Sequence, residues 1–322
     1  MNAQNFYSLT PEIVLSAVEM GGHRTTGLCY ALNSLENRVY DVELEDRSRV
    51  IVKFYRPGRW SRETILDEHH FLHACVAHDI PVCAPMNFAD GTTLKETDEG
   101  IFAALFPRVG GRAPDELFPD DLEQLGRYIA RIHRVGEVEG LKHRPTLSPA
   151  TYGTGCLNTI LSLAGMSPGV GARYRDAALQ LIAIAERMFA DHAMIPIHAD
   201  LHRGNLLRQS NGAWMVLDFD DMAFGPAVQD FWLLLPGRAQ ECPQELEALT
   251  KGYEQFRDLD SGSYRLIEVL RGLRYIRYAA WITERRDDPA FARAFPQYGT
   301  DSYWEMQMSD LYEQLRAIEI MD

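Results

Sequence analysis

His198-Ala199-Asp200-Leu201-His202-Arg203-Gly204-Asn205 is the stretch on which the interpretation of the whole chain depends. Asp200 and Asn205 stand five residues apart, and Gly204 directly precedes the asparagine. This spacing is typical of a tight loop, because neighbours on one helix face are three or four residues apart. A loop can direct both side chains at one point. We therefore expect the carboxylate and the amide to act together.

A second acidic segment, residues 216–221 with the sequence VLDFDD, follows after a short apolar run. The run Trp214–Leu217 predicts a buried strand that delivers Asp218 at its end. Asn211-Gly212, just before the run, is a strong turn signal and predicts a hairpin with residues 205–207. The hairpin-like unit would hold two aspartates, Asp200 and Asp218, together with Asn205.

Oxygen-bearing side chains of this kind suit Mg²⁺, which is usually held by one or two protein groups together with substrate phosphates. In protein kinases one aspartate accepts the proton of the acceptor hydroxyl, while an asparagine and a second aspartate hold the metal. Asp200, Asn205 and Asp218 follow the same order at the same intervals. A solvent-exposed turn would explain a lone aspartate, but the number of matching positions favours a phosphotransferase.

The two segments also depart from the protein-kinase pattern. Ala199 replaces the usual arginine, His202 is added, and Phe219 is followed by Asp220 instead of glycine. The resulting form, H-x-D-x-H-x-x-N with D-x-D, resembles the aminoglycoside phosphotransferase and choline kinase superfamily, which shares the protein-kinase fold. The resemblance implies an α+β, bilobal protein-kinase-like fold with a small β-rich N-lobe and a large, mostly helical C-lobe.

Composition and charge bound the class of protein. The chain has 322 residues, 46% of them hydrophobic, which suffices for one large or two medium domains. A net charge of −14 argues against a nucleic-acid partner or an anionic membrane surface, because either needs a basic face. No apolar run is long enough to span a membrane and the N-terminus lacks a signal pattern, so we expect a cytoplasmic protein. We separately expect a monomer. The five cysteines form no C-x-x-C pair and are expected to be free thiols.

The first third of the chain predicts a small sheet with one long helix. A first helix would begin at Pro11 after Thr10, and a second, capped by Ser61, would run to about Ala77. Runs rich in β-branched and aromatic residues predict the strands. These are residues 28–32, 39–44, 50–55, 86–88 with 92–96, and 101–106.

A glycine- and proline-rich break at residues 107–112 predicts a hinge, which we place at residues 108–112. We expect an N-lobe over residues 1–107 that binds the nucleotide, and a helical C-lobe over residues 113–322 with the catalytic loop and substrate site. Residues 141–172 predict loops with short helical pieces. Apolar stripes at helical spacing predict the C-lobe helices. These begin near residues 120, 174, 225, 244, 264 and 302.

Lys53 lies within a predicted strand, between apolar residues, and resembles the kinase lysine that contacts the α and β phosphates of ATP. The following helix offers Glu63, Asp67 and Glu68 as partners. Glu68 fits the superfamily spacing best, and Glu63 remains an alternative.

The turn at residues 33–37 lacks the glycine-rich pattern of protein kinases. Ser34 and nearby amides could meet ATP phosphates, although a plain hairpin turn explains the residues nearly as well. Backbone groups of Phe106, Arg108 and Val109 would bind the adenine edge.

Longer strings resemble the stress response kinase A family, bacterial serine/threonine protein kinases of the cytoplasm. They are Leu32–Tyr40, Val52–Pro57, His143–Thr146, Asp218–Asp221 and Gly225–Trp232. The resemblance extends from about residue 10 to residue 305.

This resemblance implies roles for individual residues. Asp200 would accept the proton of a protein Ser or Thr hydroxyl, Asn205 and Asp218 would hold Mg²⁺, and Ser34 would contact the phosphates of ATP. Lys53 would pair with Glu68. Supporting roles fall to His198, His202, Asp220 and Asp230.

Two of these positions leave alternatives. Asp230 would hydrogen-bond the catalytic-loop backbone. The alternative is that the helix dipole alone favours an acidic residue in the first turn of this helix. Ala199 departs from the family's usual glycine, which is tolerable unless the position needs a positive φ.

Two other functions fit the same residues. One is a small-molecule kinase acting on the hydroxyl of an amino alcohol, homoserine or an aminoglycoside, since the same catalytic residues would serve it. The other is a binding module that uses the fold without turnover. Retention of Lys53, Asp200, Asn205 and Asp218 counts against a binding module.

Overall fold

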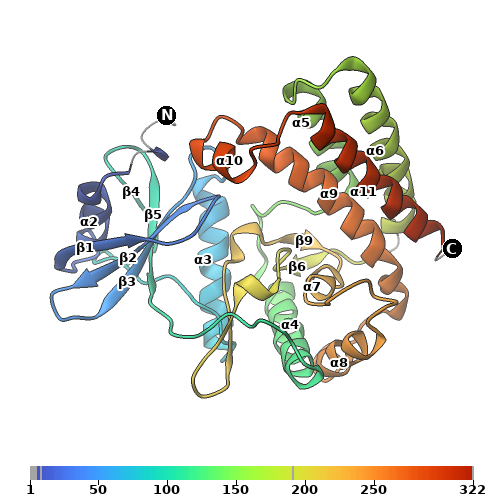
Figure 1. Cartoon of the computed structure of the whole chain (residues 1–322). Helices are drawn as coiled ribbons and strands as arrows, with labels where there is room; N and C mark the ends of the chain where they lie inside the picture. The colour runs from blue at the N-terminus through green and yellow to red at the C-terminus, as the bar shows by residue number, and fades with distance from the viewer. Residues whose placement is uncertain (1–5, 8, 191, 321–322) are drawn as a thin grey trace. The chain divides into compact units, whose positions relative to one another are not determined.

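The computed structural model describes residues 6–7, 9–190 and 192–320, and the chain folds into two compact units (Figure 1). The first unit contains the residues up to Glu116 together with Arg134–Arg144 and His202–Met222. The second contains Leu117–His133, Pro145–Leu201 and the residues from Ala223 onward.

An antiparallel sheet of five strands, in the order β1-β2-β3-β5-β4, forms the centre of the first unit. The strands are β1 (Thr25–Ala31), β2 (Arg38–Leu44), β3 (Arg49–Phe54), β4 (Lys95–Glu96) and β5 (Phe102–Pro107). The expected extended segment at residues 86–88 forms no strand. Pro85 precedes it and has no N–H to donate to a ladder, and a single amide, that of Met86, bonds to Leu105 O at 2.7 Å.

Two helices, α2 (Pro11–Glu19) and α3 (Arg62–Ala77), accompany this sheet (Figure 1). The predicted start of α3 is confirmed, because Ser61 Oγ accepts a hydrogen bond from the Thr64 amide. Pro11 occupies the first turn of α2, where its missing N–H costs nothing.

The two faces of β3 carry different residues. Val52 and Phe54 pack into an apolar cluster with Val18 of α2. Successive side chains of a strand point to opposite faces, so Lys53 projects from the other face, where Ala104 packs with residues of α3. Strand periodicity therefore directs the lysine away from the α2 core.

The predicted hairpin is confirmed. Strands β7 (Leu206–Arg208) and β8 (Trp214–Val216) pair antiparallel within the first unit. Gly212 in the turn has a φ of 83°, which glycine adopts readily. The hairpin is attached to the rest of the unit by the Val216 amide, which donates to Pro81 O at 2.8 Å.

The second unit is mostly helical, and together with the sheet of the first it confirms the predicted α+β class. Its larger elements are α4 (Pro119–Glu139, continuing into the first unit), α5 (Cys156–Leu163), α6 (Pro168–Phe189), α8 (Pro243–Tyr253), α9 (Leu266–Glu284) and α11 (Asp301–Glu319). Shorter ones are the π-helical η1 (Pro149–Gly155), α7 (Gln229–Trp232), the 3₁₀ turn η4 (Ser261–Arg265) and α10 (Pro289–Ala294), with a small sheet of β6 (Ile195–Ile197) and β9 (Ala223–Gly225).

Helices α5, α6, α9 and α11 share one apolar core, in which Tyr174, Leu273 and Trp304 are buried. Helix α6 begins at Pro168, six residues before the predicted start, because Ser167-Pro168 is an effective helix start that loop-like composition concealed. No helix among the described residues combines the length and apolarity that crossing a membrane requires.

Candidate active site

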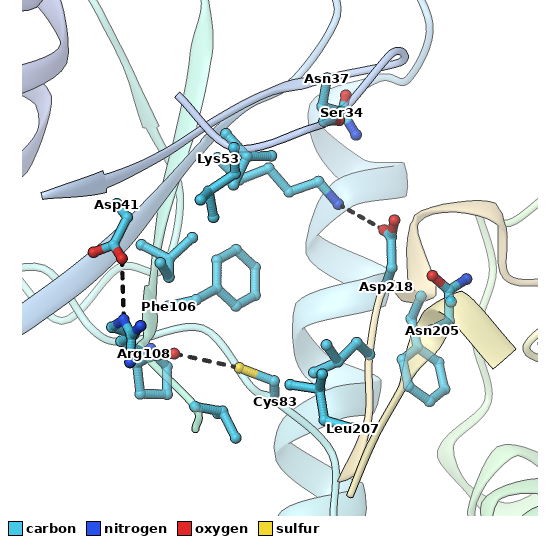
Figure 2. A pocket seen from close by; sticks show the side chains of 18 of the residues that line it. Ser34, Asn37, Asp41, Lys53, Cys83, Phe106, Arg108, Asn205, Leu207 and Asp218 are labelled. Carbon is cyan, nitrogen blue, oxygen red and sulfur yellow. Dashed lines mark hydrogen bonds and ion pairs between the residues drawn. The ribbon is translucent and has the colours of Figure 1, made fainter. Parts of the chain in front are cut away.

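A pocket of about 420 Å³ lies within the first unit, between the sheet, α3 and the β7–β8 hairpin (Figure 2). This volume is in the usual range for small-molecule sites. The pocket is lined by every residue predicted to bind ATP and by both predicted metal ligands. They are Ser34, Lys53, Glu68, Phe106, Arg108, Val109, Asn205 and Asp218.

Lys53 lies among three carboxylates. Its Nζ is 3.7 Å from Glu68 Oε1, 3.4 Å from Asp218 Oδ1 and 3.1 Å from Asp220 Oδ1. Burial alone would lower the pKa of this ammonium, but the charges of Asp220 and Glu68 hold it well above its usual value. Lys53 therefore stays protonated, and its carboxylate partner on α3 is Glu68.

Burial has the opposite effect on Glu68, which is 1% exposed. Removal from water raises the pKa of this carboxyl above its ordinary value, while the positive charge of Lys53 works against that rise. The pair fixes the lysine side chain at the wall of the pocket. Figure 2 shows the same ammonium directed at Asp218.

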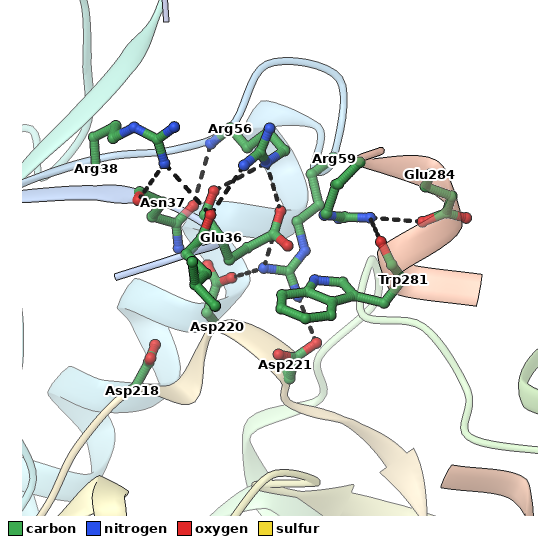
Figure 3. Close-up of polar contacts among 12 residues, drawn as sticks. Glu36, Asn37, Arg38, Arg56, Arg59, Asp218, Asp220, Asp221, Trp281 and Glu284 are labelled. Atoms are coloured by element: carbon green, nitrogen blue, oxygen red, sulfur yellow. Dashed lines mark hydrogen bonds and ion pairs between the residues drawn. The ribbon is translucent and has the colours of Figure 1, made fainter. Parts of the chain in front are cut away.

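Arginines hold the turn that carries Ser34. Arg56 donates from Nη2 to Leu35 O and from Nε to Glu36 O, both at 3.0 Å, and its amide donates to Asn37 Oδ1 at 3.1 Å. Figure 3 shows these side chains gathered around the turn. Such bonds give the turn a defined shape without the glycines that protein kinases use.

At the opposite end of the pocket, β5 ends at Pro107, which has a carbonyl but no N–H. Arg108 and Val109, which follow Pro107 and also line the pocket, each carry a backbone N–H. Arg108 Nε lies 3.0 Å from Asp41 Oδ2, and Cys83 Sγ lies 3.7 Å from Pro107 O. Burial raises the pKa of the Cys83 thiol to about 11.

Asn205 and Asp218 are brought together by the hairpin. The amide of Leu217 donates to Asn205 O at 2.9 Å, and Asn205 ends a 3₁₀ turn, η2 (Arg203–Asn205). Asp218 has a φ of 59°, and its side chain is 55% exposed. His202 holds η2 in place, because its Nδ1 accepts the Gly204 amide at 2.9 Å.

Asp220 is buried in a cluster of cations (Figure 3). It lies in the 3₁₀ turn η3 (Phe219–Asp221), where it accepts from Arg59, while Arg59 Nη2 lies 2.5 Å from Asp221 Oδ1. Arg144 donates to Asp220 O at 2.5 Å. Burial alone would raise the pKa of Asp220, but Arg59, Lys53 and Arg144 hold it well below its usual value.

Arg59 and Arg144 were not predicted. Both guanidinium groups lie 4.9 Å from the centroid of the Trp60 ring, within the range of a cation–π contact. Their partner Asp220 is 161 residues from Arg59 in the chain, and no local pattern reports such a pairing. The one signal was the string His143–Thr146, which contains Arg144.

His198 and Asp200 belong to the second unit, where Asp230 holds their loop. The Asp230 carboxylate accepts the amides of His198 at 2.7 Å and Ala199 at 2.8 Å. The side chain of Asp230 thus bonds the loop backbone, beyond any effect of the helix dipole. His133, which was not predicted, lies with Nε2 3.0 Å from Asp230 Oδ2.

Ala199 has a φ of 68°, in the left-handed region that favours glycine. The methyl group is therefore strained at this position, and the hydrogen bonds of Asp230 keep the loop in this conformation. The departure from the family's usual glycine consequently has a cost in stability.

We expect Ala199→Gly to stabilise the protein by about 1 kcal/mol, because it removes this strain. The free energy of unfolding in urea measures the effect. Ala292→Gly in α10, an exposed helical position, is the matched control and should destabilise by about 1 kcal/mol. Equal destabilisation by both substitutions would contradict the prediction.

A lysine paired with a buried glutamate, and an asparagine and aspartate at the same pocket, define a phosphotransferase site on a kinase-like fold. The chain belongs to the phosphotransferase enzyme family, whose model matches residues 31–267. The prediction of a kinase is thereby confirmed.

The relatives in sequence are kinases by name. The chain is 36% identical to Stress response kinase A of Escherichia coli K12 over 99% of its own length and 96% of the relative. It is 37% identical to Serine/threonine protein kinase RdoA of Salmonella typhimurium over 98% of its length and 96% of that protein. These matches confirm the resemblance to stress response kinase A.

Solved structures are similar in fold. One is amicoumacin kinase hAmiN, in complex with AMP-PNP, Ca²⁺ and Ami, with a TM-score of 0.75, 18% identity and 96% coverage of both chains. Another is a microcompartment-associated aminopropanol kinase, with a TM-score of 0.72, 22% identity, and coverage of 96% of this chain and 98% of that one. They confirm the kinase-like fold.

Proposed function

We propose that the chain transfers the γ-phosphate of ATP, with Mg²⁺, to a serine or threonine hydroxyl of a protein in a bacterial stress response. The observation that carries this proposal is Lys53, whose ammonium lies within 4 Å of Glu68 and Asp218 at a pocket of nucleotide size. The acceptor class rests on the names of the relatives, which match nearly the whole chain.

In this proposal the first unit binds ATP. Lys53 contacts the α and β phosphates, the turn with Ser34 donates backbone amides to them, and the backbone of residues 106–109 contacts adenine. The fixed turn and the charged lysine are ready before the nucleotide arrives, so little reorganisation is needed on binding.

Asn205 and Asp218 would hold the metal. Both present oxygen atoms at the same pocket, and the half-exposed carboxylate of Asp218 can accept a further ligand. Two protein oxygens supplemented by phosphates are the donor set that Mg²⁺ prefers. When bound, the ion would neutralise charge on the phosphates during transfer.

Asp200 would accept the proton of the acceptor hydroxyl as the oxygen attacks the γ-phosphate. Asp230 supports this role through the backbone of the residues just before it, by the hydrogen bonds to His198 and Ala199. Apart from this proton transfer, the side chains act by positioning and by charge. The net charge of −14 argues against a nucleic-acid partner for this enzyme.

The alternative is a kinase of amino alcohols, homoserine or aminoglycosides. It is favoured by the fold alone, which this chain shares with an aminopropanol kinase at 22% identity. The two proposals make different predictions about which molecule becomes labelled.

Labelled ATP distinguishes the candidates. The protein is incubated with γ-³²P-ATP and Mg²⁺ alone, with casein or histone, and with a panel of amino alcohols, homoserine and aminoglycosides. We expect label on serine or threonine of protein, and none with Asp218→Ala, whose fold is checked by its melting temperature.

Label on small molecules only would establish the alternative and overturn the proposal. Stabilisation by MgATP without any transfer would instead identify a binding module. Turnover of Asp218→Ala at the wild-type rate would contradict the assigned role of Asp218.

A further inference from the structure

An arginine lies directly beside Asp200 within the second unit. Arg274 Nη2, on α9, is 2.8 Å from Asp200 Oδ1. The side chains are 34% and 24% exposed, respectively, so both residues are partly accessible, although the Oδ1 atom of Asp200 is itself buried. The ion pair joins residues far apart in the chain and belongs to none of the kinase motifs above.

Arg274 begins a continuous strip on the surface of α9. Arg274, Arg277, Tyr278 and Trp281 have the spacing i, i+3, i+4, i+7 and form what we call the α9 face. Tyr278 is 45% exposed and stacks on Trp281 at 5.4 Å between ring centroids. The surface next to Asp200 is therefore cationic and aromatic.

The acidic groups near this face are already engaged with arginines. Glu284 Oε2 lies 3.8 Å from Arg277 Nη1 and 2.7 Å from Arg285 Nη1, while Asp200 faces Arg274. Arg277 also lies 5.6 Å from the ring of Tyr152. Three arginines, Arg274, Arg277 and Arg285, thus face the two carboxylates named here.

This distribution of charge bears on the acceptor. A cationic acceptor would compete with Arg274 for Asp200 and would meet the like charges of Arg274 and Arg277, which is costly. An acceptor with a carboxylate beside its hydroxyl could pair with Arg274 instead. Asp200 would then be released to take the proton of the hydroxyl.

We propose that Arg274 selects acceptors bearing a negative charge next to the reactive hydroxyl, so that the protein substrate carries an acidic residue beside its phosphorylated serine or threonine. This inference rests on the proposed protein kinase function. A partly exposed ion pair adds little to stability, so substitutions at Arg274 leave the fold intact.

The test uses two serine peptides that are identical except for flanking glutamates or flanking lysines. We expect wild-type kcat/KM to be about tenfold higher for the acidic peptide. Arg274→Gln should remove the difference, and Arg274→Glu should reverse it. The matched control is Arg173→Glu, which makes the same charge change at a residue whose side chain is 58% exposed, and should keep the wild-type preference.

Equal use of both peptides by the wild type, or an unchanged preference in Arg274→Glu, overturns the inference. If Arg274→Glu is inactive on both peptides, Arg277→Glu is measured in its place. A shift of its kcat/KM preference toward the basic peptide supports acceptor selection by the α9 face. An unchanged preference overturns the inference.

If the wild type labels no peptide or protein, the protein kinase proposal fails separately. Glycerate and ethanolamine are then compared as acceptors, because glycerate has a carboxylate beside its hydroxyl and ethanolamine an ammonium. Preference for glycerate supports selection by Arg274, and preference for ethanolamine overturns it.

Discussion

Asp200→Asn is expected to lower kcat for phosphoryl transfer by about a thousandfold while leaving nucleotide affinity unchanged. An amide cannot accept the hydroxyl proton, so the loss falls on the chemical step. All the residues that line the pocket proposed for ATP belong to the first unit, whereas Asp200 belongs to the second. Steady-state transfer of labelled phosphate gives kcat, and calorimetric titration with MgATP gives the affinity.

The matched control for this substitution is Asp176→Asn, which removes the same charge from an exposed position on α6 of the second unit. It should transfer phosphate at the wild-type rate. A kcat for Asp200→Asn within tenfold of the wild type would show that another group takes the proton.

Asp220→Ala is expected to destabilise the protein by about 3–5 kcal/mol, because it leaves buried cations without their partner. Asp220 is 2% exposed and lies against both Lys53 and Arg59. Its native pKa is held below the ordinary value, so its contribution is complete above pH of about 4 and is lost as the pH falls further. Urea unfolding at pH 7 measures the loss.

The control for Asp220→Ala is the neighbouring Asp221→Ala. The Asp221 side chain is 35% exposed and pairs with Arg59, so its removal should cost only about 1 kcal/mol. Equal effects of the two substitutions would mean that burial of the charge is not what makes Asp220 important.

The parts of the fold that were predicted are those with strong local signals. Ser61 caps α3 by a bond to an amide three residues away, and Asn211-Gly212 turns the chain between β7 and β8. Both signals act within a few residues, so the local sequence alone reveals them. Helix α10, only six residues long, carried too little periodicity to be noticed.

The residues of the candidate site also divide into those that a local motif predicted and those that it did not. The kinase motif placed Lys53, Asn205 and Asp218, and the structure brings them to one pocket, although their roles await the experiments above. The family spacing favoured Glu68 but left Glu63 as an alternative, because only the packing of α3 decides which carboxylate reaches the lysine. Glu68 lies 3.7 Å from Lys53.

The residues that were missed act over long separations. Arg144 reaches Asp220 across 76 residues, and His133 reaches Asp230 across 97. Arg274 reaches Asp200 from a helix whose pattern predicts only that it is amphipathic. Charged residues on helices and loops are normally solvated, so apart from the string that contains Arg144 no local pattern distinguishes these residues from their neighbours.

The reactivity of the Cys83 thiol decides how the pocket of the first unit responds to oxidants. Its thiol lines the pocket, and burial raises its pKa to about 11. At pH 7 only about one such thiol in 10⁴ is ionised, and the thiolate is the form that peroxides and electrophiles attack. The Cys83 thiol in this pocket is therefore expected to react more slowly with peroxides than more acidic thiols do.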